Sequence, residues 1–102
     1  MNLVAELQKI GFVIQVDSKV YTNLYKDTMP NYDIIVVIKN IRDVLEASVN
    51  GYHKNMQIYS KSIDLETAKD TAELFNIIHD CEKMQKNMAI HIRKNELEKD
   101  FK

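Results

Sequence analysis

The pattern of hydrophobic and polar residues predicts three β-strands in the first part of the chain. Residues 12–16 are mostly aromatic or β-branched, and residues 20–25 alternate between apolar and polar side chains, as half-buried strands do. Residues 32–39 contain the longest apolar run, from Ile34 to Ile38. Because this run does not alternate, it predicts a central strand with both faces covered.

Helix, turn and loop signals surround these strands. Apolar residues recur at helical spacing over residues 3–10, and Gly11 follows where a helix commonly ends. Residues 17–19 predict a tight turn. Residues 26–31 predict a loop, because Pro30 has no N–H group with which to join a strand ladder.

Residues 41–49 fit two patterns. They carry a helical stripe with Asn40 as its cap, and they also alternate as a strand does. The strand is favoured, because a turn at Asn50-Gly51 followed by residues 56–60 would complete a β-hairpin.

From Asp64 onward the pattern is helical, with Asp64 as the N-cap and no Gly or Pro after it. The apolar stripe nevertheless moves by roughly half a turn around the helix between Leu65 and the later apolar positions. Two interpretations stay open. Either the helix breaks near residues 76–80, or its second segment projects and presents the new stripe to a partner.

The second stripe has the alternating four- and three-residue spacing of a coiled-coil seam. It therefore predicts a self-association surface, and thus a homodimer, formed by Ile77, Cys81, Met84, Met88 and Ile92. A groove for a different partner is a third interpretation of the same stripe.

Together these patterns predict a single α+β domain over residues 1–102, of which residues 83–102 can project as a helix. A short N-terminal helix precedes an antiparallel sheet of four or five strands, and a long or broken C-terminal helix packs on one face. Strands that pair in chain order would place residues 32–39 at the centre of the sheet.

Charge is sorted along the C-terminal helix, although the net charge of the whole chain is only −1. Residues 64–82 contain six acidic side chains and one lysine, whereas residues 83–102 contain six basic and three acidic side chains. This order complements the helix dipole. It also predicts two binding surfaces: an acidic face for a basic host protein, formed by Glu66, Asp70 and Glu73, and a basic end that would suit nucleic acid.

Tyrosines form the third candidate surface. Tyr21, Tyr25 and Tyr59 are expected on the sheet face opposite the helices, where exposed tyrosines can anchor a protein partner. Few basic residues neighbour them, so a protein partner is favoured over nucleic acid.

No pattern for catalysis, metal binding or cofactor binding is found in the sequence. His79 and His91 project in different directions from one helix, and a helical His79 cannot meet Cys81 two residues away. No phosphate loop, dinucleotide fingerprint or nucleophile elbow occurs. We therefore expect no enzyme activity, no cofactor and no metal. The N-terminus lacks a secretion signal and no apolar run approaches a membrane span, so a cytoplasmic location with a reduced Cys81 is expected.

Lys, Asn and Ile are abundant and Arg occurs only twice, as AT-rich coding sequences produce. In size, composition and lack of catalytic motifs the chain resembles phage and mobile-element accessory proteins, a broad class that includes small inhibitors such as anti-CRISPR proteins. The resemblance implies a non-enzymatic protein-interaction module that inhibits or modulates a host protein. The alternative is a small dimeric nucleic-acid-binding regulator that uses Lys86, Arg93 and Lys94.

Overall fold

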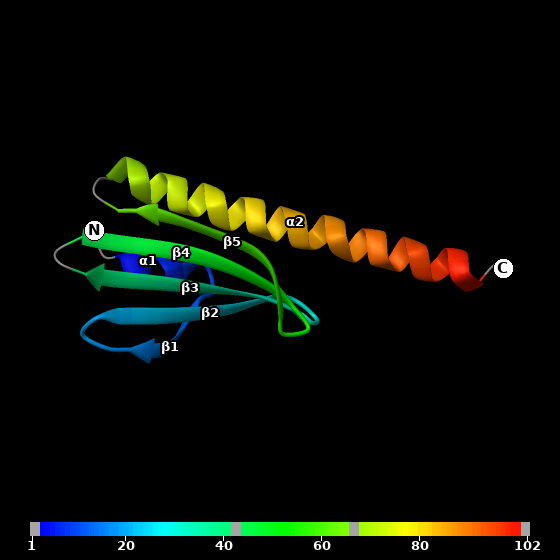
Figure 1. Ribbon diagram of the computed structural model, residues 1–102, viewed down its shortest axis with the longest axis horizontal. Helices are drawn as coiled ribbons and strands as arrows, with labels where there is room; N and C mark the ends of the chain where they lie inside the picture. Colours follow the sequence, from blue (N-terminus) through cyan, green and yellow to red (C-terminus); the bar gives the residue numbers. More distant parts are fainter. Residues whose placement is uncertain (1–2, 42–43, 66–67, 101–102) are drawn as a thin grey trace.

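A short N-terminal helix, one antiparallel sheet and a long C-terminal helix follow one another along the chain in the computed structural model (Figure 1). The structure describes residues 3–41, 44–65 and 68–100, with the side chains of 41, 44, 68–70 and 95–100 excepted. The elements are α1 (Leu3–Lys9), β1 (Val13–Asp17), β2 (Tyr21–Met29), β3 (Tyr32–Ile41), β4 (Val44–His53), β5 (Met56–Asp64) and α2 (Ala68–Asp100). The strands pair in chain order with β3 at the centre, so the predicted α+β fold is confirmed.

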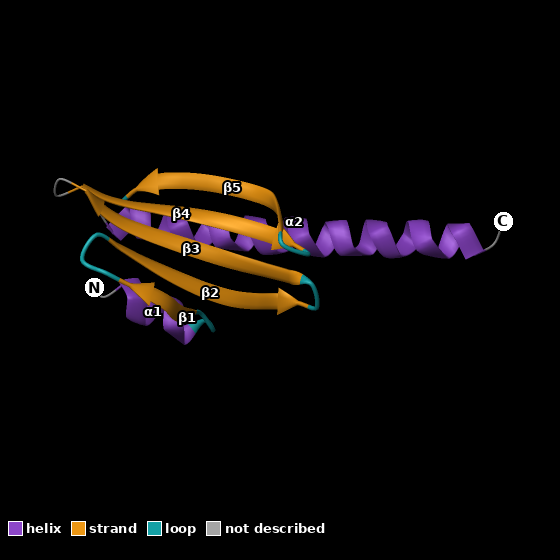
Figure 2. Ribbon diagram, turned by 60° about the horizontal axis from the view of Figure 1, so that its bottom comes forward, coloured by secondary structure: helices purple, strands orange, loops and turns teal. Residues whose placement is uncertain are grey.

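Both helices lie on the same face of the sheet (Figure 2). Leu7 of α1, Leu24 of β2 and Leu74 of α2 are each fully buried between the two layers. The core continues through alternate residues of the central strands, because successive side chains of a strand point to opposite faces. Its other fully or nearly buried members include Phe12, Ile34, Val36, Ala47, Val49, Ile78 and Cys81.

β2 is longer than the sequence predicts. Residues 26–31 were expected to form a loop, but pairing with β3 continues to Met29, which lies opposite Tyr32. Only Pro30 and Asn31 remain for the turn, and Asn31 takes the left-handed conformation with φ 71°. Pro30 lies beyond the ladder, so its missing N–H group does not end the strand earlier.

The strand predicted within residues 41–49 is confirmed over the part that the structure describes, as the first half of β4. The turn predicted at Asn50-Gly51 is wrong, because both residues lie inside β4. The chain reverses instead at Lys54 and Asn55, whose φ values are 50° and 67°. Two consecutive left-handed residues are what a tight turn between twisted strands requires.

α2 is one continuous helix, so of the two interpretations left open by the sequence, the one with a break near residues 76–80 is wrong. The apolar stripe appears to change face because the predicted helix included Leu65, which lies before the helix. The N–H group of Leu65 instead donates a 2.6 Å hydrogen bond to the carbonyl oxygen of Leu45. Ala72 is exposed, and the buried stripe begins at Leu74. α2 then continues past the end of the sheet (Figure 1).

A buried glutamine fixes α2 along the sheet. The side chain of Gln85 is fully buried, and its Oε1 accepts a 2.8 Å hydrogen bond from the Thr28 hydroxyl. Its Nε2 donates to the backbone oxygens of Asp33 at 2.8 Å and Tyr52 at 3.3 Å. Because these partners belong to β2, β3 and β4, sliding of the helix along the sheet would break all three bonds.

Candidate functional site

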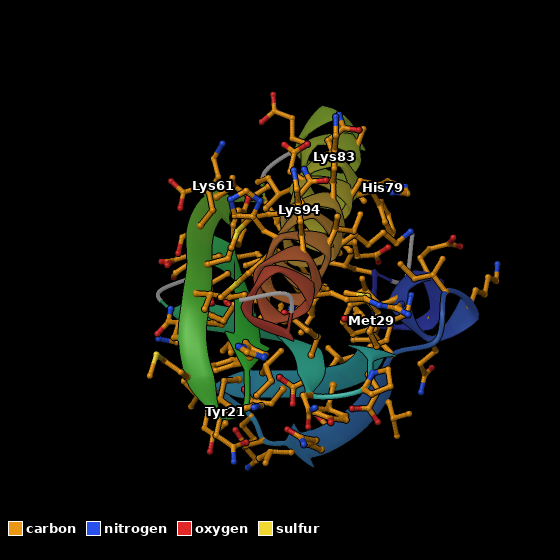
Figure 3. All side chains as sticks on the ribbon, turned by 90° about the vertical axis from the view of Figure 1, so that its right-hand side faces the viewer. Tyr21, Met29, Lys61, His79, Lys83 and Lys94 are labelled. Carbon is orange, nitrogen blue, oxygen red and sulfur yellow. The ribbon has the colours of Figure 1, made fainter. Side chains whose placement is uncertain are left out.

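The face of the sheet opposite the helices is uncovered in the part of the chain that the structure describes. We call it the open face. Strand pairing and side-chain alternation place on it Val13, Val16, Tyr21, Asn23, Tyr25, Asp27, Asp33, Ile35, Val37, Lys39, Glu46, Ser48, Asn50, Tyr52, Gln57, Ser60, Ser62 and Asp64. In the end-on view of Figure 3, Tyr21 lies on the side of the sheet away from α2.

The central strand shows most clearly that this face lacks a cover. Ile34, Val36 and Ile38 are buried under the helices, whereas Ile35 and Val37 between them are half-buried on the open face. The expectation that both faces of this strand are covered is therefore wrong for the described chain.

The apolar part of the open face lies over β1, β2 and β3. Val13 is 62% exposed, and Val16 and Tyr21 are each 40% exposed. Ile35 pairs with Tyr25, which in turn pairs with Val13, so one apolar row crosses three strands. Such a row is larger than the isolated apolar residues that any protein surface carries.

Asn23 interrupts this apolar surface. It pairs with Val16 on one side and Val37 on the other, and its Oδ1 is buried without a hydrogen-bond partner. A buried acceptor with no donor costs about 1–3 kcal/mol.

The part over β4 and β5 is polar and internally bonded. Asn50 Nδ2 donates to the Ser48 hydroxyl at 3.3 Å, and Asn50 Oδ1 accepts from Ser60 at 3.0 Å and Gln57 at 3.4 Å. The side-chain oxygen of Asn50 is therefore hydrogen-bonded, whereas the side-chain oxygen of Asn23 is not. The surface that lacks contacts lies over β1, β2 and β3.

The open face is acidic. Among the residues that the structure describes, four carboxylates lie on it (Asp27, Asp33, Glu46 and Asp64) against the single amine of Lys39. The Tyr25 hydroxyl donates a hydrogen bond to Asp27. That bond, together with desolvation and the nearby Asp33, raises the pKa of Tyr25 above its usual range, so this tyrosine stays a neutral donor.

Only two of the three predicted tyrosines share this face. Tyr59 pairs with Gly51 on the helix side and packs against the core, and burial raises its pKa. Its predicted position is wrong because a register shift between Gly51 and Tyr52 changes which residues of β5 face the helices. A shift of one residue moves every side chain to the other face.

The predicted self-association stripe is divided between core and surface. Ile77 and Cys81 pack against the sheet with 6% and 0% exposure, so they cannot meet a second chain in this conformation. Met84, Met88 and Ile92 are half-buried and line a largely apolar groove of about 560 Å³ with Asn87 and His91.

The predicted acidic helix face is only partly visible. Glu66 and the side chain of Asp70 lie outside the described part of the structure, and Glu73 is exposed on α2. Glu73 lines a small hollow of about 190 Å³ together with Asp80 and Lys61. The charge of this hollow is therefore mixed.

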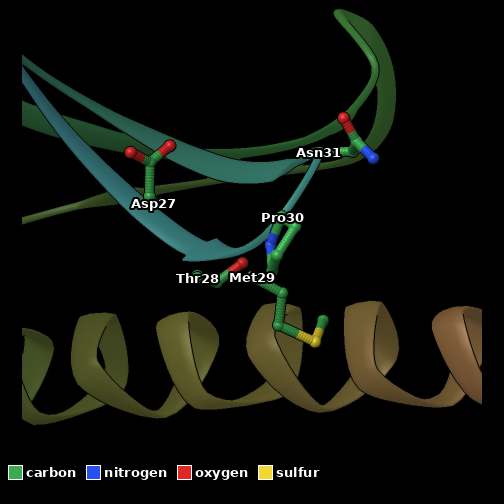
Figure 4. Close-up of a pocket in the computed structure, with 5 residues that line it drawn as sticks. All are labelled: Asp27, Thr28, Met29, Pro30 and Asn31. Carbon is green, nitrogen blue, oxygen red and sulfur yellow. The ribbon is translucent and has the colours of Figure 1, made fainter.

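The β2–β3 turn forms another hollow, of about 470 Å³, whose described lining is residues 27–31 (Figure 4). Met29 points toward α2 there, and Asp27 points away from it. A single carboxylate on one turn offers no constellation for catalysis. Among the described residues, no three His, Cys, Asp or Glu side chains are placed to hold a metal ion together.

No protein-family model matches the chain, and no curated protein or solved structure matches it either. Neither described helix has a stretch long and apolar enough to cross a bilayer. The open face was missed by sequence reasoning, apart from Tyr21 and Tyr25. The available signal was the run from Ile34 to Ile38, which contains the apolar residues of both faces.

Proposed function

We propose that this protein is a non-enzymatic interaction module that binds a protein partner through the open face. The observation that carries the proposal is that Ile35 and Val37 are only half-buried on the central strand, where a sheet is normally most protected. Burial of apolar surface stabilises an interface by about 25 cal/mol per Å² before the costs of association are subtracted. At the centre of this surface the buried Oδ1 of Asn23 has no hydrogen-bond partner among the described residues.

The charge of the open face indicates which partner fits. Four carboxylates and one lysine surround or adjoin the apolar rows, so a partner with basic side chains around an apolar contact is complementary. A second copy that presented the same acidic face would be repelled. We therefore propose that the partner is a different protein with a basic surface. A basic protein partner is also what the sequence predicts.

The resemblance to phage accessory proteins makes a bacterial host protein the first partner to test, with inhibition or modulation as the expected consequence of binding. We also propose that the protein is located in the cytoplasm, where Cys81 would remain a thiol.

The test is affinity capture by the tagged protein from a low-GC bacterial lysate treated with nuclease, read by mass spectrometry. The variant Val16→Lys/Tyr21→Lys places two positive charges on the open face at side chains that are already exposed. The matched control is Ile90→Lys, an equally drastic change at a 66% exposed position of α2. We expect one dominant protein with the wild type and the control, and its loss with the double variant.

Capture that persists with Val16→Lys/Tyr21→Lys would contradict binding through the open face. Capture that disappears with nuclease treatment would instead favour the nucleic-acid alternative. Lys86, Arg93 and Lys94 are all exposed on α2 and would be the residues to replace in that case.

A further inference from the structure

A pocket of about 330 Å³ lies where two β-turns meet α2, on the helix side of the sheet. Its lining comes from the β2–β3 turn, the β4–β5 turn and α2, as Asn31, Tyr32, His53, Lys54, Ala89, Ile92 and Arg93. The two turns are joined by a 2.9 Å hydrogen bond from the N–H group of Lys54 to the carbonyl oxygen of Asn31. The pocket is therefore built by the fold and does not need a ligand to assemble its walls.

The polar lining of this pocket is rich in hydrogen-bond donors. Lys54 and Arg93 bring two positive charges, and His53 and Asn31 add ring and amide N–H groups. Among the side chains that the structure describes, the pocket lining contains no carboxylate, and neither Lys54 nor Arg93 forms an ion pair. Two cations that have no ion pair within the described part of the chain, beside further donors, form an environment that favours an anion.

The apolar lining suits a flat ring. Tyr32 is 6% exposed and stacks on His53, with ring centroids 4.4 Å apart and planes 20° from parallel. Ala89 and Ile92 form the helix side of the wall. The volume of about 330 Å³ falls within the range of roughly 300–1,000 Å³ that small-molecule pockets occupy.

We propose that this pocket binds the phosphate of a nucleotide, with the phosphate on Lys54 and Arg93 and the attached ring against the aromatic and aliphatic wall. A phosphate monoester carries a charge of about −1.5 to −2 at neutral pH, which matches two cations better than a carboxylate does. The phosphate can come from a free nucleotide or from the end of a nucleic-acid strand. Strand pairing places Tyr32 and His53 on the side of the sheet opposite the open face, so this site is separate from the proposed docking surface.

Isothermal titration calorimetry at low salt tests the proposal, with adenosine monophosphate, inorganic phosphate and adenosine as probes. We expect adenosine monophosphate to bind more tightly than inorganic phosphate, and adenosine to bind least. Arg93→Gln and Lys54→Gln should each weaken binding by about tenfold or more, because each removes a charged hydrogen bond. Lys83→Gln is the matched control, since Lys83 is exposed on the side of α2 away from the sheet (Figure 3), and it should leave affinity within about twofold.

Single-stranded oligonucleotides with and without a 5′-phosphate distinguish the two sources. Tighter binding of the phosphorylated strand than of adenosine monophosphate, lost in Arg93→Gln, would assign the site to a strand end, whereas preference for the free nucleotide would assign it to a small ligand. The proposal is overturned if neither phosphate probe binds up to about 10 mM, or if Lys83→Gln weakens binding as much as Arg93→Gln does. Binding of strands that ignores both the 5′-phosphate and Arg93 would overturn it as well.

Discussion

Gly51 lies directly beneath Cys81, and the absence of a side chain on Gly51 allows α2 to approach the sheet. A Cβ atom at residue 51 would stand 2.5 Å from the Cys81 sulfur, 3.2 Å from Cβ of Tyr59 and 3.3 Å from Nε2 of Gln85. The first of these distances is far below van der Waals contact. Gly51 is therefore required for packing, since its φ lies outside the left-handed region.

Gly51→Ala should lower the free energy of unfolding by about 1–3 kcal/mol, the usual cost of overpacking a core. The same substitution in a Cys81→Ala background should cost clearly less, because the sulfur atom that creates the closest contact is gone. Urea denaturation of the wild type, both single variants and the double variant measures this coupling. Equal costs in the two backgrounds would show that the contact with Cys81 does not set the requirement for glycine.

Replacement of Gln85 should be strongly destabilising. Gln85→Met keeps the shape of the side chain but removes its three hydrogen bonds, so we expect a loss of about 2–4 kcal/mol in urea denaturation. Thr28→Val removes one of these bonds and should cost about 1 kcal/mol.

Gln8→Met serves as the control for Gln85→Met, because Gln8 is exposed on α1 and should change stability by no more than about 0.5 kcal/mol. If Gln85→Met is as mild as this control, the hydrogen bonds of Gln85 do not hold the helix on the sheet.

The class and order of the elements could be predicted from the sequence, because alternation, apolar runs and the long uninterrupted helix are local signals. The packing of α2 could not. Leu65 appeared to start a helical stripe, yet it lies just before the helix and bonds to Leu45, a residue of another strand. Gly51 appeared to mark a turn, whereas its role depends on Cys81 from a distant segment.

In the candidate site too, features that depend on neighbouring residues could be predicted, and features that depend on distant segments could not. Tyr21 and Tyr25 were placed on the open face by simple alternation, and pairing within β2 preserves that alternation. Tyr59 was misplaced because the register shift beside Gly51 depends on how β4 and β5 pair. The pocket that contains Arg93 is lined by residues of two turns and of α2. No spacing pattern in the sequence indicates that these three segments lie close together.

Self-association through the apolar groove on α2 stays a prediction that light scattering can test. Met84, Met88 and Ile92 line that groove, so a charge at its centre should prevent two helices from meeting there. We expect the wild type to form dimers at high concentration and Met88→Glu to be monomeric at the same concentration. Lys83→Glu is the control, and it should leave the oligomeric state unchanged. A wild type that is monomeric throughout would contradict this prediction.

The thiol of Cys81 should be protected in the folded protein and should make stability fall at alkaline pH. Burial, with the nearby Glu82 carboxylate, raises the pKa of Cys81 to about 12. The unfolded chain loses the thiol proton near pH 8.5, so above that pH the unfolded state binds fewer protons than the folded state. The free energy of unfolding therefore decreases as pH rises from about 8.5 toward 12, and below that window this contribution is constant.

Thiol labelling with a disulfide reagent at pH 8 measures the protection directly, and it should be slow in buffer and fast in urea. Urea denaturation at pH 8 and pH 9.5 measures the linkage, and Cys81→Ala should lose less stability over this interval than the wild type does. The interval stops at pH 9.5 because Tyr25 and Tyr59, whose pKa values are also raised, destabilise the fold in the same direction once unfolded tyrosines ionise near pH 10. Rapid labelling of the folded protein would show that α2 leaves the sheet often enough to expose Cys81, and would contradict the anchoring assigned to Gln85.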